Sequence, residues 1–273
     1  MGKISDALEK ADRSTESSVV PREVEGVKTA EKNVLPLSNA LKLNKDKELD
    51  ERLITYFAPR SVEAELFKVL RTNLLFPSAG KPPRIVLVTS ATQGDGKSFI
   101  SSNLAVIIAQ GIEEHVLLVD ADIRSPMIHR YFGIGSVEGL SEFLAKDNDV
   151  SKILQKTKIP KLSILPGGKP PLNPTELLSS KKMKALLEEV RERYDDRYII
   201  IDSPPLAIAA ETSAIANYVD GVIFVIRSGK TPRAAIYEAI EQIGREKILG
   251  IVLNDSEQSL KKYYGYKKYS SEQ

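Results

Sequence analysis

A glycine-rich loop near residue 95 joins a strand pattern to a helix pattern, and this junction constrains the fold more than any other stretch. Val86–Val88 have the composition of a strand interior, and Leu104–Ile108 form one apolar side of a predicted helix. The loop between them holds two glycines, a lysine and a serine, namely Gly94, Gly96, Lys97 and Ser98. A buried strand that ends in such a loop and restarts as a helix predicts a phosphate site at the helix start.

The loop matches the P-loop pattern over Ala91–Ser98, except that Ala91 stands where the first glycine is expected. Glycines let backbone N–H groups approach phosphate oxygens, because no Cβ is in the way. We expect Lys97 to reach the β- and γ-phosphates and the Ser98 hydroxyl to bind Mg²⁺. The predicted nucleotide-binding residues are Gly94, Asp95, Gly96, Lys97, Ser98 and Phe99. The alternative is a glycine-rich turn with a solvated lysine, which the agreement of strand, loop and helix disfavours.

Composition excludes several classes of protein. The chain of 273 residues has no cysteine, which excludes a disulfide framework, a thiolate nucleophile and a zinc–cysteine site. The net charge of +2 does not indicate a nucleic-acid partner, and none is expected. The sequence contains neither a signal-peptide pattern nor an apolar run of about 18 residues, so we expect a cytoplasmic protein.

Composition also divides the chain into three parts. Residues 1–50 form a charged segment, expected to be flexible apart from a short amphipathic helix near its start. Residues 51–258 alternate between predicted strands, at 84–89, 115–120, 161–165, 198–202, 221–227 and 249–254, and predicted helices, of which the clearest are 98–110, 175–194 and 233–244. This alternation predicts an α/β fold with a mostly parallel sheet and helices on both faces. Residues 259–273 form a tyrosine-rich tail.

Three aspartates end predicted strands. Asp120 and Asp122 are two residues apart at the end of one strand, so both carboxylates can face one site, and Asp202 ends another strand. Ligands of open α/β sheets bind at the carboxyl ends of the strands. Carboxylates, the Ser98 hydroxyl and phosphate oxygens suit Mg²⁺. The predicted metal ligands are therefore Ser98, Asp122 and Asp202, although each aspartate alone is also compatible with a loop cap or a solvated strand end.

The tail combines aromatic and basic residues without a hydrophobic period. Tyr263, Tyr264, Tyr266 and Tyr269 alternate with Lys261, Lys262, Lys267 and Lys268. Such a segment is also compatible with stacking on single-stranded nucleic acid or contact with anionic lipid. Four tyrosines within seven residues are hard to explain as core.

Taken together, these motifs resemble those of the cytoplasmic bacterial tyrosine kinases, over roughly residues 55–273. The stretches that carry the resemblance are the P-loop, the tyrosine tail, VLLVDADIR, IIIDSPP, YFAPRSVEAELFKVLRTNL, RSPMIHRYFG and LPGGKPPLNPTELL. That family has the P-loop NTPase fold and is unrelated to eukaryotic kinases, and this chain has neither an HRD nor a DFG tripeptide.

The resemblance implies an ATP- and Mg²⁺-dependent autokinase that phosphorylates its tail in trans and regulates exopolysaccharide or capsule polymerisation and export. It also implies a ring-like homo-oligomer, a membrane chain-length-determinant or co-polymerase protein as activator, and a phosphotyrosine phosphatase as a further partner. The protein would act at the inner face of the membrane through its membrane partner.

The same resemblance assigns residue roles. Lys97 would stabilise the transferring phosphoryl group, and the phosphoacceptors would be Tyr263, Tyr264, Tyr266 and Tyr269. Asp120 would orient or deprotonate the incoming tyrosine, or else support the metal ion. Asn254 ends the last predicted strand and either contacts adenine or simply ends the strand.

A predicted helix over Ser61–Leu74 is the expected oligomer contact. Its apolar stripe is predicted to be Val62, Leu66, Val69 and Leu70. Glu65, Lys68 and Arg71 recur every third residue, where the family carries a Glu-x-x-Arg-x-x-Arg motif that packs on the neighbouring subunit. Lys68 replaces the first arginine and lacks its planar fork. The alternative is pairing of these charges within the helix.

Two other functions compete with the kinase. The first is an ATP-gated interaction subunit that binds nucleotide and switches a membrane assembly without transferring phosphate. The second is a partition-type ATPase. Those ATPases carry an additional lysine five positions before the P-loop lysine, and this chain has Thr92 there.

Overall fold

The computed structural model describes residues 48–146, 150–193 and 197–256. Nearly all of the predicted N-terminal segment, and the tail with its four predicted phosphoacceptors, lie outside these residues.

A single seven-stranded sheet runs through the described part of the chain, in the strand order β3-β4-β2-β5-β1-β6-β7. Every neighbouring pair is parallel except β3–β4. The strands are β1 (Ile85–Ser90), β2 (His115–Asp120), β3 (Gln155–Lys156), β4 (Leu162–Leu165), β5 (Arg197–Asp202), β6 (Gly221–Arg227) and β7 (Ile248–Asn254). The predicted mostly parallel α/β fold is confirmed.

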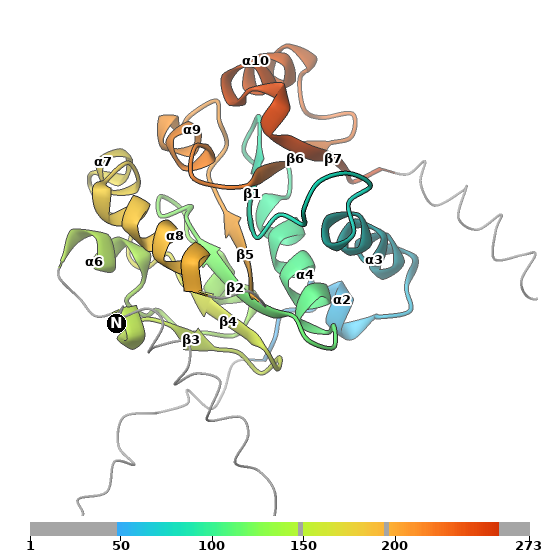
Figure 1. Cartoon of the computed structure of the whole chain (residues 1–273), viewed down its shortest axis with the longest axis horizontal. Helices are drawn as coiled ribbons and strands as arrows, with labels where there is room; N and C mark the ends of the chain where they lie inside the picture. The colour runs from blue at the N-terminus through green and yellow to red at the C-terminus, as the bar shows by residue number, and fades with distance from the viewer. Residues whose placement is uncertain (1–47, 147–149, 194–196, 257–273) are drawn as a thin grey trace, which may run out of the picture.

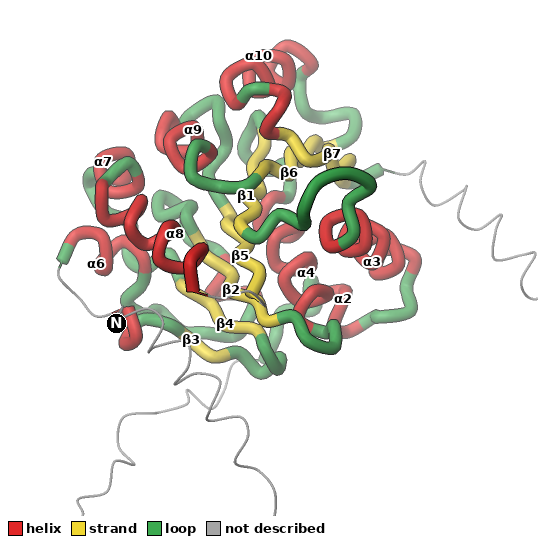
Figure 2. The backbone as a smooth tube through the Cα atoms, viewed as in Figure 1, coloured by secondary structure: helices red, strands yellow, loops and turns green. Residues whose placement is uncertain are grey.

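Helices cover both faces of this sheet (Figure 1). One set is α2 (Ile54–Phe57), α3 (Val62–Leu75), α4 (Lys97–Ala109) and α5 (Ile128–Tyr131). The other set is α6 (Leu140–Ala145), α7 (Pro174–Leu178), α8 (Lys181–Arg193), α9 (Ala210–Ala216) and α10 (Arg233–Ile243). Two short 3₁₀ turns complete the order, η2 (Val150–Lys152) and η3 (Arg245–Lys247). The tube drawing shows green loops joining these helices to the strand ends (Figure 2).

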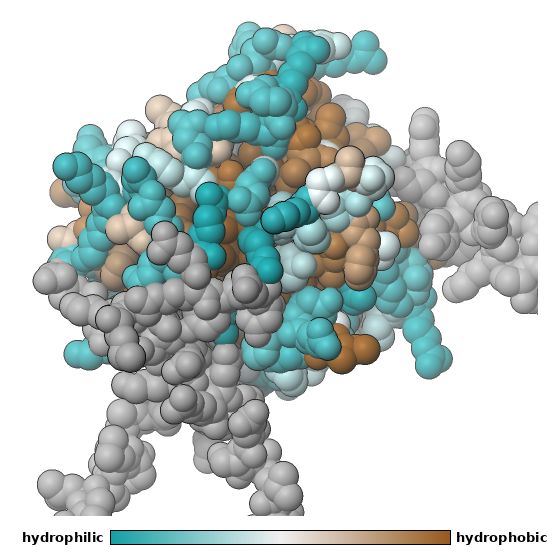
Figure 3. Space-filling model, in the orientation of Figure 1, coloured by the Kyte–Doolittle hydropathy of each residue, from teal (hydrophilic) through white to brown (hydrophobic). Residues whose placement is uncertain are grey.

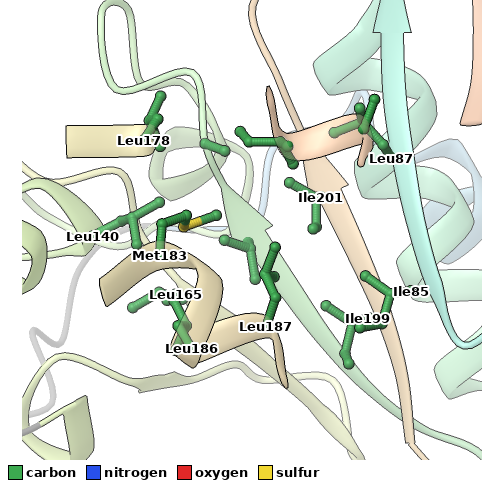
Figure 4. Packing of buried hydrophobic residues seen from close by; sticks show 14 of the residues in the cluster. Ile85, Leu87, Leu140, Leu165, Leu178, Met183, Leu186, Leu187, Ile199 and Ile201 are labelled. Atoms are coloured by element: carbon green, nitrogen blue, oxygen red, sulfur yellow. The ribbon is translucent and has the colours of Figure 1, made fainter. Parts of the chain in front are cut away.

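Strand side chains alternate between two apolar cores, one on each face. Ile85 and Leu87 pack with the helices from α6 to α10, whereas Val86 and Val88 pack with those from α2 to α5. Such double burial explains why the central strands are continuous runs of valine, isoleucine and leucine. In the first core, Met183 and Leu186 of α8 pack in the same cluster as Leu165 of β4 (Figure 4). Each such side chain contributes about 1.5–3 kcal/mol by burial.

The edge strand β7 differs from the central strands, because its residues alternate between half-buried and exposed. Leu249, Ile251 and Leu253 are its exposed apolar side chains. In the space-filling view, brown apolar surface is visible where β6 and β7 lie in Figure 1 (Figure 3).

Two predicted helices differ from the structure. The helix predicted over 175–194 is two helices, α7 and α8, because the Ser180 hydroxyl caps a new start by accepting the Met183 N–H. In α3, the stripe prediction was wrong for Leu66 and Val69, which are exposed, because Phe67 and Leu74 occupy the inward row instead.

Candidate functional site

The predicted nucleotide-binding and metal-binding residues meet at the carboxyl-end edge of the sheet. The strands β1, β5 and β2 lie side by side there, and Asp120 is the register partner of Asp202. Val88 of β1 is the partner of Asp202 on its other side. The loop after β1 therefore lies beside the two aspartate-bearing strand ends, although these segments are far apart in the sequence.

The glycine-rich loop has the backbone that a phosphate cradle requires. Gly94 and Gly96 adopt φ angles of 83° and 101°, which residues with a Cβ rarely adopt. Gly96 is also tightly enclosed, because a Cβ there would lie 2.1 Å from Nδ2 of Asn254. The helix α4 begins at Lys97, and no side chain caps its start. Its first N–H groups and its dipole are consequently available to an anion.

Asp95 shapes the loop from inside. Its buried carboxylate accepts hydrogen bonds from the Thr92 N–H and hydroxyl, at 3.0–3.1 Å, and from the Thr231 hydroxyl, at 2.7 Å. The Asn254 amide donates to the Asp95 carbonyl at 2.9 Å. Thr92 and Asn254 thus both stabilise the conformation of the loop. The Phe99 ring packs edge-on against Phe67 of α3.

Ser98 and Asp202 form a direct pair, since the Ser98 hydroxyl donates to Asp202 Oδ2 at 2.6 Å. Asp202 Oδ1 is buried and has no hydrogen-bond partner among the described residues. Burial raises the pKa of Asp202 to about 7, while the Ser98 hydrogen bond and the Lys97 charge oppose the shift. A buried carboxylate oxygen without a partner is costly unless a cation or donor satisfies it.

Asp120 is more enclosed than its neighbours. Its Oδ2 accepts the N–H groups of Met127 and Ile128 at 3.0 Å each, whereas its Oδ1 is buried without a partner among the described residues. Complete burial and the nearby charge of Asp202 raise the pKa of Asp120 well above its usual value.

Asp122 lies nearer the surface and accepts the Ser125 N–H at 3.2 Å. Burial raises its pKa, and the positive charges of Lys97 and Arg124 oppose that shift. Lys97 itself is nearly buried, contrary to the solvated-turn alternative.

These residues fit Mg²⁺ bound together with a nucleotide. Within the described ranges, no three acidic or histidine side chains group closely enough to hold a metal ion by themselves. Mg²⁺ commonly takes one or two carboxylates and completes its shell with phosphate oxygens and water. The Ser98–Asp202 pair with its free oxygen, and Asp122 beside it, provide that partial set.

The structure adds a charged network that the sequence prediction missed. Arg124 Nε donates to Glu211 Oε1 at 2.7 Å, and Arg124 Nη2 donates to Thr175 Oγ1 at 3.0 Å. The Thr175 hydroxyl donates in turn to Glu211 Oε2 at 3.0 Å. Glu211 is completely buried, which for a carboxylate requires such partners. The arginine beside Asp122 was the available signal, but its partners come from distant helices.

The predicted oligomer residues lie on α3. Lys68 Nζ pairs with Glu65 Oε1 at 2.7 Å within the helix, as the alternative interpretation expected. Arg71 Nη1 donates to the Ile107 carbonyl of α4 at 3.1 Å.

The chain matches a family model described as an AAA domain over residues 83–247. It is 36% identical over 229 residues to tyrosine-protein kinase YwqD of Bacillus subtilis, covering 83% of this chain and 95% of that one. Among solved structures, the kinase domain of Escherichia coli tyrosine kinase ETK is 29% identical with a TM-score of 0.70, covering 78% of this chain and 84% of that one. The septum site-determining protein MinD complexed with Mg-ADP, from Pyrococcus horikoshii, is 20% identical with a TM-score of 0.54, covering 64% and 72%, and shows the fold alone.

Among the residues placed in the structure, no helix has the length and apolar character needed to cross a bilayer.

Proposed function

The chain belongs to the bacterial tyrosine-protein kinases of the P-loop NTPase fold, and on that premise we propose that it is an ATP- and Mg²⁺-dependent autokinase that phosphorylates its C-terminal tyrosines in trans. The observation that carries the proposal is the pairing of Ser98 with Asp202 beside Lys97, at the uncapped start of α4.

We propose that the loop over Gly94–Phe99 binds the ATP phosphates through backbone N–H groups, with Phe99 contributing its backbone while its ring packs on Phe67. Lys97 would hold the β- and γ-phosphates, and Ser98, Asp122 and Asp202 would hold Mg²⁺. The metal ion, when bound, neutralises charge on the phosphate oxygens. Asp95 supports this arrangement indirectly, because its carboxylate is already engaged within the loop.

The proposed reaction transfers the γ-phosphoryl group to a tyrosine oxygen. The phenolic oxygen bonds to the γ-phosphorus, the bond from that phosphorus to the β–γ bridging oxygen breaks, and ADP leaves. Asp120 is the proposed acceptor of the phenolic proton, through its unpartnered Oδ1. The complete burial of Asp120 favours its other proposed role, as a support for the metal ion.

The proposed acceptors are Tyr263, Tyr264, Tyr266 and Tyr269, which lie outside the described residues. Transfer in trans is proposed to occur within a homo-oligomer that is ring-like and uses the α3 surface of Glu65, Lys68 and Arg71. Exposed Leu66 and Val69 on that helix support this surface. The membrane co-polymerase partner, the phosphatase and the control of polysaccharide export follow from family membership and are proposed on that ground.

A mixing experiment tests transfer in trans. Lys97→Met keeps the acceptors but lacks the phosphate-binding lysine, whereas a variant with phenylalanine at all four tail positions keeps the site but lacks the acceptors. Neither is expected to phosphorylate its own tail, and with Mg²⁺-ATP the mixture should phosphorylate the Lys97→Met chain. If wild type phosphorylates itself while the mixture stays unmodified, transfer occurs within one chain.

A further inference from the structure

The guanidinium of Arg124 is fixed on one side and free on the other. Glu211 of α9 accepts from its Nε, and Thr175 of α7 accepts from its Nη2. Its Nη1 makes no hydrogen bond with the described residues, and the side chain is 39% exposed. An arginine anchored in this way presents donors in a fixed direction at little further cost in side-chain entropy.

Two exposed aliphatic side chains each lie three residues before one of the residues that anchor this arginine. Leu172 is 105% exposed and precedes Thr175 by three residues, while Ile208 is 61% exposed and precedes Glu211 by three residues. Three residues span at most about 10 Å, so each side chain is attached within that chain distance of an Arg124 anchor.

Both segments also run beside the backbone of the predicted site. The segment that leads to Leu172 passes Asp120, because a Cβ at Gly167 would lie 3.3 Å from the Asp120 carbonyl oxygen. The residue before Ile208 is bonded to the start of the phosphate loop, through the Ala207 N–H and the Ala91 carbonyl at 3.2 Å. Pro170, Pro171 and Pro174 restrict the backbone on either side of Leu172.

We propose that Arg124, Leu172 and Ile208, together called the acceptor rim, bind the side chain of the tail tyrosine that is to be phosphorylated. Leu172 and Ile208 contact the two sides of the aromatic ring, and the free edge of Arg124 donates a hydrogen bond to the phenolic oxygen. Glu211 and Thr175 are positioning residues, because they act through Arg124. The acceptor rim rests on the proposed function and assigns its acceptor subsite.

The chemistry of the rim fits this occupant. Exposed aliphatic side chains suit the faces of a ring, and arginine supplies donors only, which suits an oxygen that gains negative charge as it attacks phosphorus. The tail carries four lysines and no acid over residues 261–269, and the buried Glu211 already compensates the charge of Arg124. The tail lysines are therefore not repelled by an uncompensated positive charge on Arg124.

Peptide binding tests the rim without requiring phosphoryl transfer. The probe is a fluorescent peptide of residues 257–273, titrated with Mg²⁺ and a non-hydrolysable ATP analogue. The protein is the full chain with phenylalanine at its four tail tyrosines, so that its own tail offers no phenol. Leu172→Ala and Ile208→Ala should each weaken peptide binding about threefold or more. Both side chains are exposed, so the fold should persist.

Ile112→Ala is the matched control, since Ile112 is 94% exposed but precedes β2, at the opposite edge of the sheet. It should leave peptide affinity unchanged. If Leu172→Ala and Ile208→Ala bind the peptide as tightly as Ile112→Ala does, the acceptor rim does not bind the acceptor tyrosine.

The role of Arg124 is tested by a double-mutant cycle. A peptide with phenylalanine at all four tyrosine positions should bind about tenfold or more weakly than the tyrosine peptide. Arg124→Lys keeps the positive charge beside Glu211 but loses the planar guanidinium. In this variant, most of the difference in affinity between the tyrosine and phenylalanine peptides should therefore disappear. A loss of affinity for the ATP analogue, with the tyrosine–phenylalanine difference retained, would assign Arg124 to the nucleotide instead.

The autokinase proposal and the acceptor-rim proposal can be refuted independently of each other. If wild type transfers no phosphate to its tail, the kinase proposal fails, while peptide binding still reports on the rim. If wild type is an active autokinase and the rim variants bind the peptide normally, only the rim fails.

Discussion

Asp202 and Asp120 are partners across neighbouring strands, yet their surroundings predict different roles. Asp202 pairs with Ser98 and has one free oxygen, so Asp202→Asn should weaken Mg²⁺-dependent nucleotide binding by about tenfold or more. Asp120→Asn should leave nucleotide affinity near wild type and slow phosphoryl transfer, if Asp120 accepts the proton. Calorimetric titration with Mg²⁺-ADP and single-turnover phosphorylation measure the two effects. Equal loss of nucleotide affinity in both variants would make Asp120 a metal-supporting residue.

At the residue scale, the sequence was sufficient for the side chains that a strand-end or loop motif of their own marks. The predicted residues Lys97, Ser98 and Asp202 meet because each ends or follows a parallel strand, and such ends share one edge. Arg124 was overlooked because its importance comes from Glu211, a residue 87 positions away on another helix. No strand-end or loop motif marks Glu211 as its partner, unlike Asp202, whose place at the end of a strand predicted its contact with the loop.

At the scale of elements, the buried side-chain amide of Asn103 holds α2 against α4. Asn103 of α4 accepts from the Thr55 N–H and hydroxyl at 3.0 Å each, and it donates to the Arg52 carbonyl at 2.9 Å. Asn103→Ala should lower the free energy of unfolding by about 3 kcal/mol, because several buried polar groups lose their partners. Urea denaturation measures the loss. Asn73→Ala, at an exposed position of α3, is the control and should change stability by less than about 0.5 kcal/mol. Equal stability of the two variants would contradict this account of Asn103.

Sequence prediction was strongest for the strands and weaker for the helices. A buried parallel strand needs apolar residues on both faces, so runs such as Ile85–Val88 stand out without knowledge of their neighbours. The inward face of α3 depends on where α4 lies, so the pattern alone could not distinguish Leu66 from Phe67. The break between α7 and α8 depends on a single serine cap, which apolar periodicity does not detect.

At the scale of the whole molecule, the buried carboxylates predict how stability varies with pH. The folded pKa of Asp202 is about 7, above its ordinary value, so the folded state binds this proton more tightly than the unfolded state does. Stability should therefore fall as pH rises toward about 7, and Asp120, with its raised pKa, acts in the same direction. The lowered pKa values of Glu142 and Glu211 act only at more acidic pH.

Without nucleotide or metal, the free energy of unfolding should be about 2 kcal/mol larger at pH 5.5 than at pH 8. Urea denaturation in a chelating buffer measures this difference, and Asp202→Asn should reduce it. Greater stability of the wild type at pH 8 would contradict the electrostatic account of the site.

Tail phosphorylation is predicted to loosen the proposed oligomer. Residues 261–269 carry four lysines and no acid, and each phosphotyrosine adds about −1.5 to −2 charge. A phosphorylated tail should be repelled by the carboxylates of a neighbouring site. Phenylalanine at the four tail positions keeps the positive charge, so that variant should stay assembled with Mg²⁺-ATP while wild type dissociates. Light scattering before and after ATP addition is the measurement. Equal dissociation of both would exclude tail phosphorylation as the release step.

The central claim is that this site transfers phosphate to the tail tyrosines, and the most direct test is the mass of the chain after incubation with Mg²⁺-ATP. Wild type should gain mass in multiples of one phosphate, and fragmentation should locate the additions at Tyr263, Tyr264, Tyr266 and Tyr269. Lys97→Met should reduce the gain by about 100-fold or more while the chain stays folded, because the lysine stabilises the transferring group. Nucleotide binding by wild type with no gain in mass would contradict the account and indicate an ATP-gated interaction subunit.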